Sequence, residues 1–180
     1  MYHAQVSKDM EPELAKLEVT DKEVKDYYKS APEIRTAHIL FRVRVEGTND
    51  EAEAAMKKAM EVYEKVKKNP AKFGELANKY SQSTSAPNGG DLGFQPSLFM
   101  APEFFTAIKD KSKDFITPPV RTQFGYHIIK VLALKDFKDI NIPQYKKILY
   151  DKKRDAVIEN YFEKIRKSAA IKINNEVLNN

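Results

Sequence analysis

The chain has 180 residues, of which 42% are hydrophobic and 32% charged, with a formal net charge of +5 and no cysteine. These values fit one compact domain with extensions or two small units, and the absence of cysteine excludes disulfides and thiolate metal sites. No apolar run in the sequence approaches the roughly 20 residues of a membrane span. Acidic residues interleave with the lysines almost throughout, which is typical of a solvated surface rather than a tract that binds nucleic acid.

The first half of the chain alternates helical and extended patterns. Residues 9–30 predict a helix that restarts at the capping-box pattern Thr20-Asp21-Lys22-Glu23. Residues 34–45 are rich in branched side chains and predict a strand. Apolar residues then recur at helical spacing, so helices are expected over 50–68 and 71–80.

The second half begins with a change in composition. Residues 81–97 are rich in Ser, Thr, Asn, Pro and Gly and predict a loop. The remaining expected elements are a short helix at 101–109, an extended connection at 117–120, a strand at 126–134, a helix at 143–168 and a short strand at 171–173. This order of elements predicts an α+β domain with helical segments outside it.

Two histidines fall in the predicted strands, His38 in the first and His127 at the start of the last. A lone strand histidine is usually structural, with its ring hydrogen-bonded in the core. Metal binding would need a third ligand, and His3 at the far N-terminus is a poor one, so no metal site is predicted. No G-x-S-x-G elbow occurs, and Gly89–Gly93 is not followed by the Gly-Lys-Ser/Thr of a phosphate loop.

Four sequence blocks occur in the order and at the spacing of a known family. They are Arg35–Leu40, Tyr80–Ser85 with Gly89–Gly93, Met100–Phe104 and Thr122–Ile129. Together they resemble the parvulin-type peptidyl-prolyl isomerases. The resemblance implies an α+β fold with a small, antiparallel-rich sheet surrounded by helices.

The resemblance also implies the substrate site. Leu92, Met100 and Phe104 would form an apolar cup for the proline ring of a substrate. The alternative interpretation is that these three side chains are ordinary core residues.

Four polar residues are implied as the catalytic group. His38 and His127 would be paired beneath the active site, with Thr122 in their hydrogen-bond network. Ser83 stands where the family usually has Cys or Asp, so the negative charge of an acid or thiolate is absent there. The family's mechanism breaks no covalent bond, and neither a cofactor nor a metal is expected.

Other positions depart from the family's pattern. Gln95 replaces an aromatic residue, Leu98 stands where glycine is common, and Ala101 lacks the amide often found beside the methionine. These departures bear on catalytic efficiency more than on the fold. Arg42 and Arg44 are all that remains of the basic loop of phosphate-directed parvulins, so specificity for phosphorylated substrates is not expected.

The flanking segments resemble those of SurA/PrsA-like bacterial chaperones. On this basis residues 1–33 and 137–180 are expected to be parts of a helical chaperone module on either side of an isomerase domain at 34–136. The resemblance implies unfolded or proline-containing polypeptide clients, a periplasmic or other extracytoplasmic location, and no integral membrane segment in this chain. It leaves open a homodimer formed through the helical extensions. Residues 1–5 lack the basic and then apolar start of a secretory signal.

Three functions are therefore weighed. The first is an active peptidyl-prolyl isomerase. The second is a chaperone or peptide-binding module with weak or no isomerase activity, which the serine at position 83 favours. The third is a basic nucleic-acid binder, which charge alone leaves open and which salt-sensitive retention of DNA or RNA would reveal. We expect the first, and no nucleic-acid partner.

Overall fold

The computed structural model describes residues 10–44 and 46–168 of the chain. Its residues fall into two compact units, one of Tyr27–Ile140 and one of Met1–Asp26 with Asn141–Asn180. The strand predicted at 171–173 and the N-terminal His3 lie outside the described residues. Among the described helices, none combines the length and apolarity needed to cross a membrane.

The unit Tyr27–Ile140 is built on an antiparallel sheet. Its described residues form four strands in the spatial order β2-β1-β4-β3. The strands are β1 (Ile34–Arg42), β2 (Asp91–Gln95), β3 (Val120–Thr122) and β4 (Gly125–Leu134). The two strands predicted most clearly are confirmed as β1 and β4, which pair along the whole of β1 with one irregularity between Arg35 and Thr36. The α+β fold class is confirmed.

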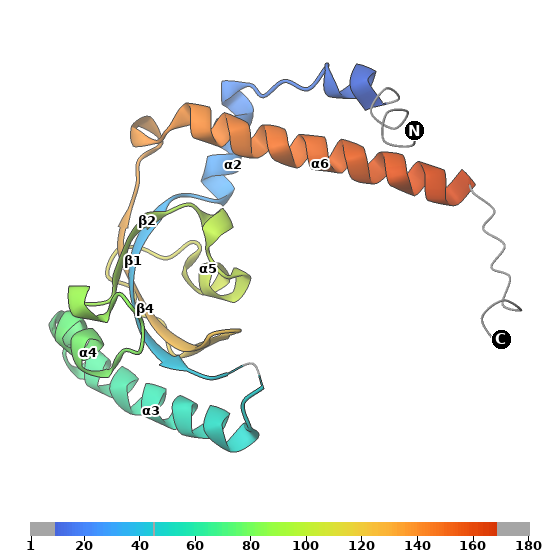
Figure 1. The fold of residues 1–180 in the computed structure, drawn as a ribbon. Coiled ribbons are helices and arrows are strands. Elements are labelled where there is room, and N and C mark those ends of the chain that lie inside the picture. Colours follow the sequence, from blue (N-terminus) through green and yellow to red (C-terminus); the bar gives the residue numbers. More distant parts are fainter. Residues whose placement is uncertain (1–9, 45, 169–180) are drawn as a thin grey trace, which may run out of the picture. The chain divides into compact units, whose positions relative to one another are not determined.

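Helices cover both faces of this sheet (Figure 1). On one face, α3 (Asn49–Lys68) and α4 (Phe73–Tyr80) pack against Ala37, Ile39, Phe41 and Val43. On the other face, α5 (Pro102–Ile108) packs against Ile34, Ile129 and Val131. Because successive side chains of a strand point to opposite faces, the even-numbered side chains of β1 lie on the face of α5. His38 is one of them.

Two strands lie where composition predicted irregular structure. β2 falls inside the predicted loop 81–97, and β3 begins at the last residue of the predicted connection 117–120. The loop prediction was wrong at residues 91–95, and the extended connection was right except that its last residue begins a strand. Both strands were missed because they depend on their neighbours rather than on their own periodicity. β2 pairs with β1 from Ile34 to Ala37, and an ion pair of 2.5 Å between Arg35 and Asp91 lies beside that pairing.

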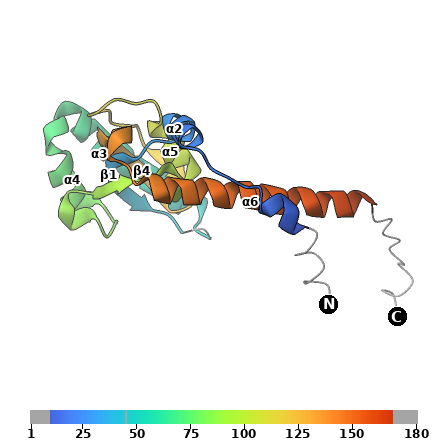
Figure 2. The same cartoon turned by 90° about the horizontal axis from the view of Figure 1, so that it is seen from above.

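The other unit contains the long helix α6 (Ile142–Ser168), seen along its length in Figure 2. It confirms the helix predicted at 143–168. The capping box is also confirmed at the start of α2 (Asp21–Ser30), where the Glu23 N–H donates to Thr20 Oγ1 over 3.2 Å. Lys153 of α6 donates to the Glu23 carboxylate over 2.6 Å, and this bond, with those from Thr20, lowers the pKa of Glu23 to about 2.

One buried hydroxyl in β1 has no hydrogen-bond partner among the described residues. It is Oγ1 of Thr36, a residue with no exposed surface. An unsatisfied buried polar group costs about 1–3 kcal/mol. We therefore expect Thr36→Val, which replaces the hydroxyl with a methyl group of similar size, to raise the free energy of unfolding by about 1 kcal/mol in urea denaturation.

Thr117 provides the matched control for this prediction. It is equally buried, but its hydroxyl accepts a hydrogen bond from the Ile129 N–H over 3.1 Å. Thr117→Val leaves that buried donor unpaired, so the same chemical change should lower stability by about 1–3 kcal/mol. A loss of stability in both variants would contradict the account of Thr36.

Candidate active site

The two strand histidines meet on the face of the sheet that α5 covers. In the antiparallel pairing of β1 and β4, Leu40 lies opposite His127 and His38 lies opposite Ile129. His38 and His127 are therefore diagonal neighbours on one face, close enough for their rings to touch. Their Nδ1 atoms lie 3.1 Å apart, and both residues are buried.

Each ring has a hydroxyl partner at its other nitrogen. Nε2 of His38 lies 2.8 Å from Ser83 Oγ, in the loop after α4. Nε2 of His127 lies 2.8 Å from Thr122 Oγ1, at the end of β3. The four side chains thus form a continuous row of three hydrogen bonds, Ser83–His38–His127–Thr122, which we call the histidine relay.

The loop that carries Ser83 is fixed to the edge of β1. β2 pairs with β1 only as far as Ala37, and beyond that point the loop takes its place. The Gln82 N–H donates to the Leu40 carbonyl over 2.8 Å, and the Leu40 N–H donates to Ser81 Oγ over 3.0 Å. Ser83 Oγ also accepts from the Ser85 N–H over 3.2 Å. These bonds hold the hydroxyl against the His38 ring.

Burial keeps both imidazoles of the relay uncharged at neutral pH. It lowers the pKa of His38 to about 4. It lowers the pKa of His127 to about 3, with smaller contributions from the charges of His38 and Arg121. When two neutral rings are joined through their Nδ1 atoms, one Nδ1 donates and the other accepts. This choice determines which atom donates in each of the other two hydrogen bonds of the row.

The relay has two proton arrangements when both rings are neutral. If His38 donates from Nδ1, its Nε2 accepts from Ser83 and His127 donates from Nε2 to Thr122. In the other arrangement all three bonds are reversed. Both arrangements satisfy every ring nitrogen, so the relay can hold the two rings in fixed orientations without a charge.

An apolar hollow of about 190 Å³ opens above the relay. Its lining residues are His38, Leu92, Gln95, Phe99, Met100, Ala101, Phe104, Phe124 and His127. The buried ring of Phe104 makes edge contacts with both imidazoles, with ring centroids 6.0 Å from His38 and 5.6 Å from His127. The histidines and Phe104 therefore form one packed floor.

The structure thus brings the seven predicted site residues together in two layers. Leu92, Met100 and Phe104 line the hollow with both histidines. Ser83 and Thr122 do not line it and lie behind the rings that they contact. Within the described residues, no group of three His, Cys, Asp or Glu side chains is placed to hold a metal ion.

Two aromatic residues at this site were not predicted. Phe99 and Phe124 line the hollow but remain 65% and 56% exposed, so they form its rim rather than its floor. Their sequence signal is weak: each is an aromatic residue in a segment without periodicity. Exposed aromatic side chains beside an apolar hollow are typical of a binding site for an apolar group.

The comparison with protein families gives one match to this region. The family model described as "Rotamase: PPIC-type PPIASE domain" matches residues 38–133, more than half of the chain. The matched range starts at His38 and contains every residue of the relay and of the hollow.

Similar proteins carry the names of foldases and chaperones. The chain is 36% identical over 168 residues to "Foldase protein PrsA" of Geobacillus sp. (strain WCH70), covering 90% of this chain and 56% of that protein. It is 28% identical over 137 residues to "Chaperone SurA" of Bordetella parapertussis, covering 74% of this chain and 26% of that protein. The chain spans about half the length of the PrsA relatives that it matches.

A solved structure has a similar fold. The crystal structure of "Peptidylprolyl Isomerase (PrsA) from Bacillus anthracis" superposes with a TM-score of 0.57 at 29% identity. The match covers 95% of this chain and 70% of that one.

Proposed function

We propose, because the chain belongs to the family of PPIC-type peptidyl-prolyl isomerase (rotamase) domains, that it accelerates rotation about the X–Pro bonds of polypeptide clients. The uncatalysed rotation is slow because amide resonance is lost in the twisted state, at a barrier of about 18–20 kcal/mol. No bond breaks, so the site needs only to bind the twisted imide better than either planar form. A thousandfold acceleration corresponds to about 4 kcal/mol.

The observation that carries this proposal is the apolar hollow over an uncharged relay. Leu92, Met100 and Phe104 would hold the pyrrolidine ring. The planar imide is more polar than the twisted imide because only the planar form has amide resonance. In this water-poor site the planar form therefore loses more favourable solvation than the twisted form does. The twisted state would then be favoured without any nucleophile.

The relay would position the floor of the hollow rather than transfer protons. His38 and His127 are neutral, and each has both ring nitrogens in hydrogen bonds. Ser83 and Thr122 would fix which way the rings face. The serine at position 83 keeps the relay uncharged, where an aspartate would add a negative charge beside His38.

The nature of the clients and the location of the protein are also proposals. The relatives' names, foldase and chaperone, support binding of unfolded polypeptides. The same likeness supports a location outside the cytoplasm. We propose residues 34–136 as the isomerase domain, with residues 1–33 and 137–180 as parts of a client-binding helical module; a homodimer through those parts stays a prediction.

Met100 gives the test of the proline-ring site. Met100→Ala removes an apolar wall of the hollow, and a buried methionine side chain is worth about 1.5–3 kcal/mol when its contacts form. We expect kcat/KM for an X–Pro peptide to fall about tenfold, which equals about 1.4 kcal/mol. Exchange NMR of the peptide measures the rate, and a thermal melt shows that the variant is folded.

Met60→Ala is the matched control. Met60 lies on α3, does not line the apolar hollow and is partly exposed. Its truncation should leave kcat/KM within about twofold. If the unmodified chain binds the peptide but does not accelerate exchange, the peptide-binding alternative replaces the isomerase proposal. Equal losses in Met60→Ala and Met100→Ala would show that the hollow is not the site.

A further inference from the structure

The apolar hollow continues into a row of further hollows on the surface of Tyr27–Ile140. A second hollow, of about 450 Å³, shares His38, Phe124 and His127 with it. A third, of about 650 Å³, shares three residues with the second, namely Arg42, Val43 and Arg44. A fourth, of about 360 Å³, shares Phe41, Lys58 and Gln82 with the third. We call this row of hollows, in which each shares lining residues with the next, the track.

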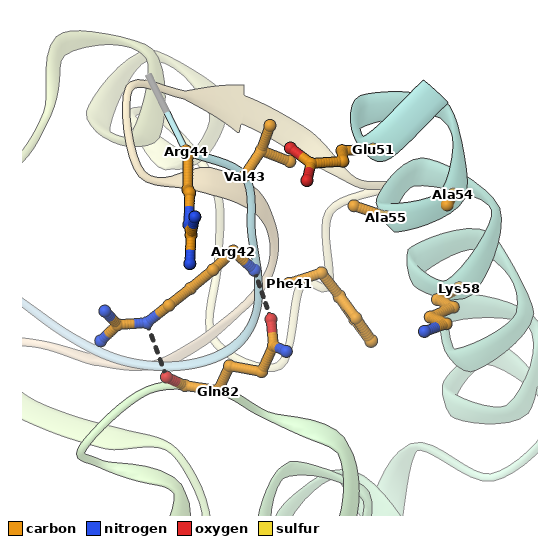
Figure 3. Close-up of a pocket in the computed structure, with 9 residues that line it drawn as sticks. All are labelled: Phe41, Arg42, Val43, Arg44, Glu51, Ala54, Ala55, Lys58 and Gln82. Carbon is orange, nitrogen blue, oxygen red and sulfur yellow. Dashed lines mark hydrogen bonds between the residues drawn. The ribbon is translucent and has the colours of Figure 1, made fainter. Parts of the chain in front are cut away.

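The track passes around the end of β1 and then follows the groove between α3 and α4. Figure 3 shows the turning point, where Arg42 and Arg44 extend on one side while Phe41 and Lys58 face the space between the strand and α3. Arg42 is held in place there: its N–H donates to Gln82 Oε1 over 2.6 Å and its Nε to the Gln82 carbonyl over 2.9 Å. The guanidinium keeps its other N–H groups for a ligand.

Positive charge lines the track everywhere beyond the apolar hollow. The hollow over the relay is lined by no charged residue. The outer three hollows are lined by five cations, Arg42, Arg44, Lys58, Lys65 and Lys79, and by the two acids Glu51 and Glu61. None of the five cations forms an ion pair among the residues that the structure describes.

The two outermost lysines are crowded together. Lys65 donates to the Tyr80 hydroxyl over 3.2 Å, and both Lys65 and Lys79 lie within 5.4 Å of the centre of that ring. Their charges lower the pKa of Tyr80, with the Lys65 hydrogen bond as the largest cause. Three lysines and one acid, Glu61, line this fourth hollow, so an excess of positive charge remains that favours the binding of an anion.

The two acids that line the track, Glu51 and Glu61, offset only part of this positive charge. Glu51 is engaged in the capping box of α3, where it accepts from the Thr48 N–H over 3.3 Å. The floor is apolar, because Phe41 and Val62 are buried beneath the cations. A ligand that combines carboxylates with apolar side chains therefore fits better than a uniformly charged polymer.

We infer that the track holds the part of the client that extends to one side of the proline, and that it selects acidic side chains several residues away from it. The inference rests on the proposed isomerase function and names its substrate class: extended polypeptide with acidic residues near an X–Pro bond. Arg42 and Arg44 receive the nearer part of the peptide. Lys58, Lys65 and Lys79 receive carboxylates farther along.

The test compares three peptides that share the same X–Pro centre. One carries glutamates at the third to sixth positions before the proline, one carries them at the same positions after it, and one carries glutamines at both. We expect one of the two acidic peptides to have a kcat/KM about five to ten times that of the glutamine peptide at low salt. The advantage should disappear at about 0.5 M salt, because exposed charges are screened.

Two triple variants locate the effect. Lys58→Gln/Lys65→Gln/Lys79→Gln should lower kcat/KM for the acidic peptide to the value for the glutamine peptide. Lys57→Gln/Lys68→Gln/Lys72→Gln removes the same charge from exposed positions of the same region that line no part of the track. This control should keep the advantage.

The outcomes distinguish failure of the track from failure of the proposed isomerase function. No turnover of any peptide would overturn the isomerase function itself. Turnover of the glutamine peptide without any acidic advantage, or an equal loss in both triple variants, would overturn the track alone. Stronger inhibition by polyphosphate than by the acidic peptide, lost in the Lys58/Lys65/Lys79 variant, would assign the groove to a polyanion and overturn it as a client track.

Discussion

Replacing Gly90 with alanine is expected to lower the free energy of unfolding of the unit Tyr27–Ile140 by about 3–5 kcal/mol. Single substitutions have effects of this size mainly at strained or overpacked positions. Gly90 has φ +80°, in the left-handed region, and the Cβ of an alanine would lie 2.3 Å from the His38 carbonyl oxygen. The backbone that carries this oxygen is fixed in position, because the His38 N–H donates to the Gly90 carbonyl over 2.9 Å. No side-chain rotation can relieve the clash.

The clash also lies next to the relay. Separating Gly90 from β1 moves the backbone of His38, and with it the ring that contacts His127, Ser83 and Phe104. We therefore expect the Gly90→Ala variant, where it still folds, to lose isomerase activity as well as stability. Urea denaturation followed by circular dichroism measures the first effect, and exchange NMR of an X–Pro peptide measures the second.

Gly93→Ala separates the clash from the backbone strain. Gly93 has φ +69°, a left-handed conformation like that of Gly90, but a Cβ there would meet no atom within 4 Å. This variant should lose only the 1–2 kcal/mol that the left-handed conformation costs a residue with a side chain. If Gly90→Ala and Gly93→Ala proved equally unstable, the close approach of Gly90 to β1 would have no energetic importance.

The contrast between β1 and β2 explains how much of this fold could be predicted from sequence. β1 has a run of branched and apolar residues that is buried on both faces, so its own composition predicts a strand. β2 is the segment Asp91–Gln95, with a glycine at its centre and a polar residue at each end. It becomes a strand through its pairing with the edge of β1 and through the ion pair of Arg35 with Asp91, neither of which leaves a local signal.

The same distinction applies to the site. His38 and His127 lie 89 residues apart, and no property of either residue indicates the other. Their pairing was expected only because four sequence blocks together resemble a family. Phe99 and Phe124 had no such support, and they reach the hollow because of the positions of a short 3-10 helix, Ser97–Phe99, and of the turn between β3 and β4.

The relay itself has a pH dependence whose sign follows from the two lowered pKa values. An imidazole in the unfolded chain has a pKa of about 6.5, against about 4 for His38 and about 3 for His127 in the folded protein. At pH 8 both rings are almost wholly neutral in both states, so their titration does not affect stability there. As the pH falls through 6.5, the two imidazoles bind protons in the unfolded chain but not in the folded protein. The free energy of unfolding therefore falls as the pH falls.

The expected loss between pH 8 and pH 5 is about 2 kcal/mol for each histidine, or about 4 kcal/mol for the pair. The window from pH 6.5 to 5 isolates this effect from the carboxylates. Ionised Asp91 is stabilised by the hydrogen bond from Arg35, which lowers its pKa, so its contribution is lost only at more acid pH. Urea denaturation at pH 8, 6.5 and 5 measures the slope.

His127→Gln supplies the matched variant, because glutamine can still bond to Thr122 and His38 but does not titrate in this range. It should be less stable than the unmodified protein at pH 8 and should lose only about half as much stability between pH 8 and pH 5. Isomerase activity of the folded protein, in contrast, should stay nearly constant from pH 8 to pH 5, because both rings keep their neutral form there. An activity that fell with a midpoint near pH 6.5 would mean that one imidazole titrates freely, and the relay would then be a proton-exchanging group and not a fixed support for the hollow.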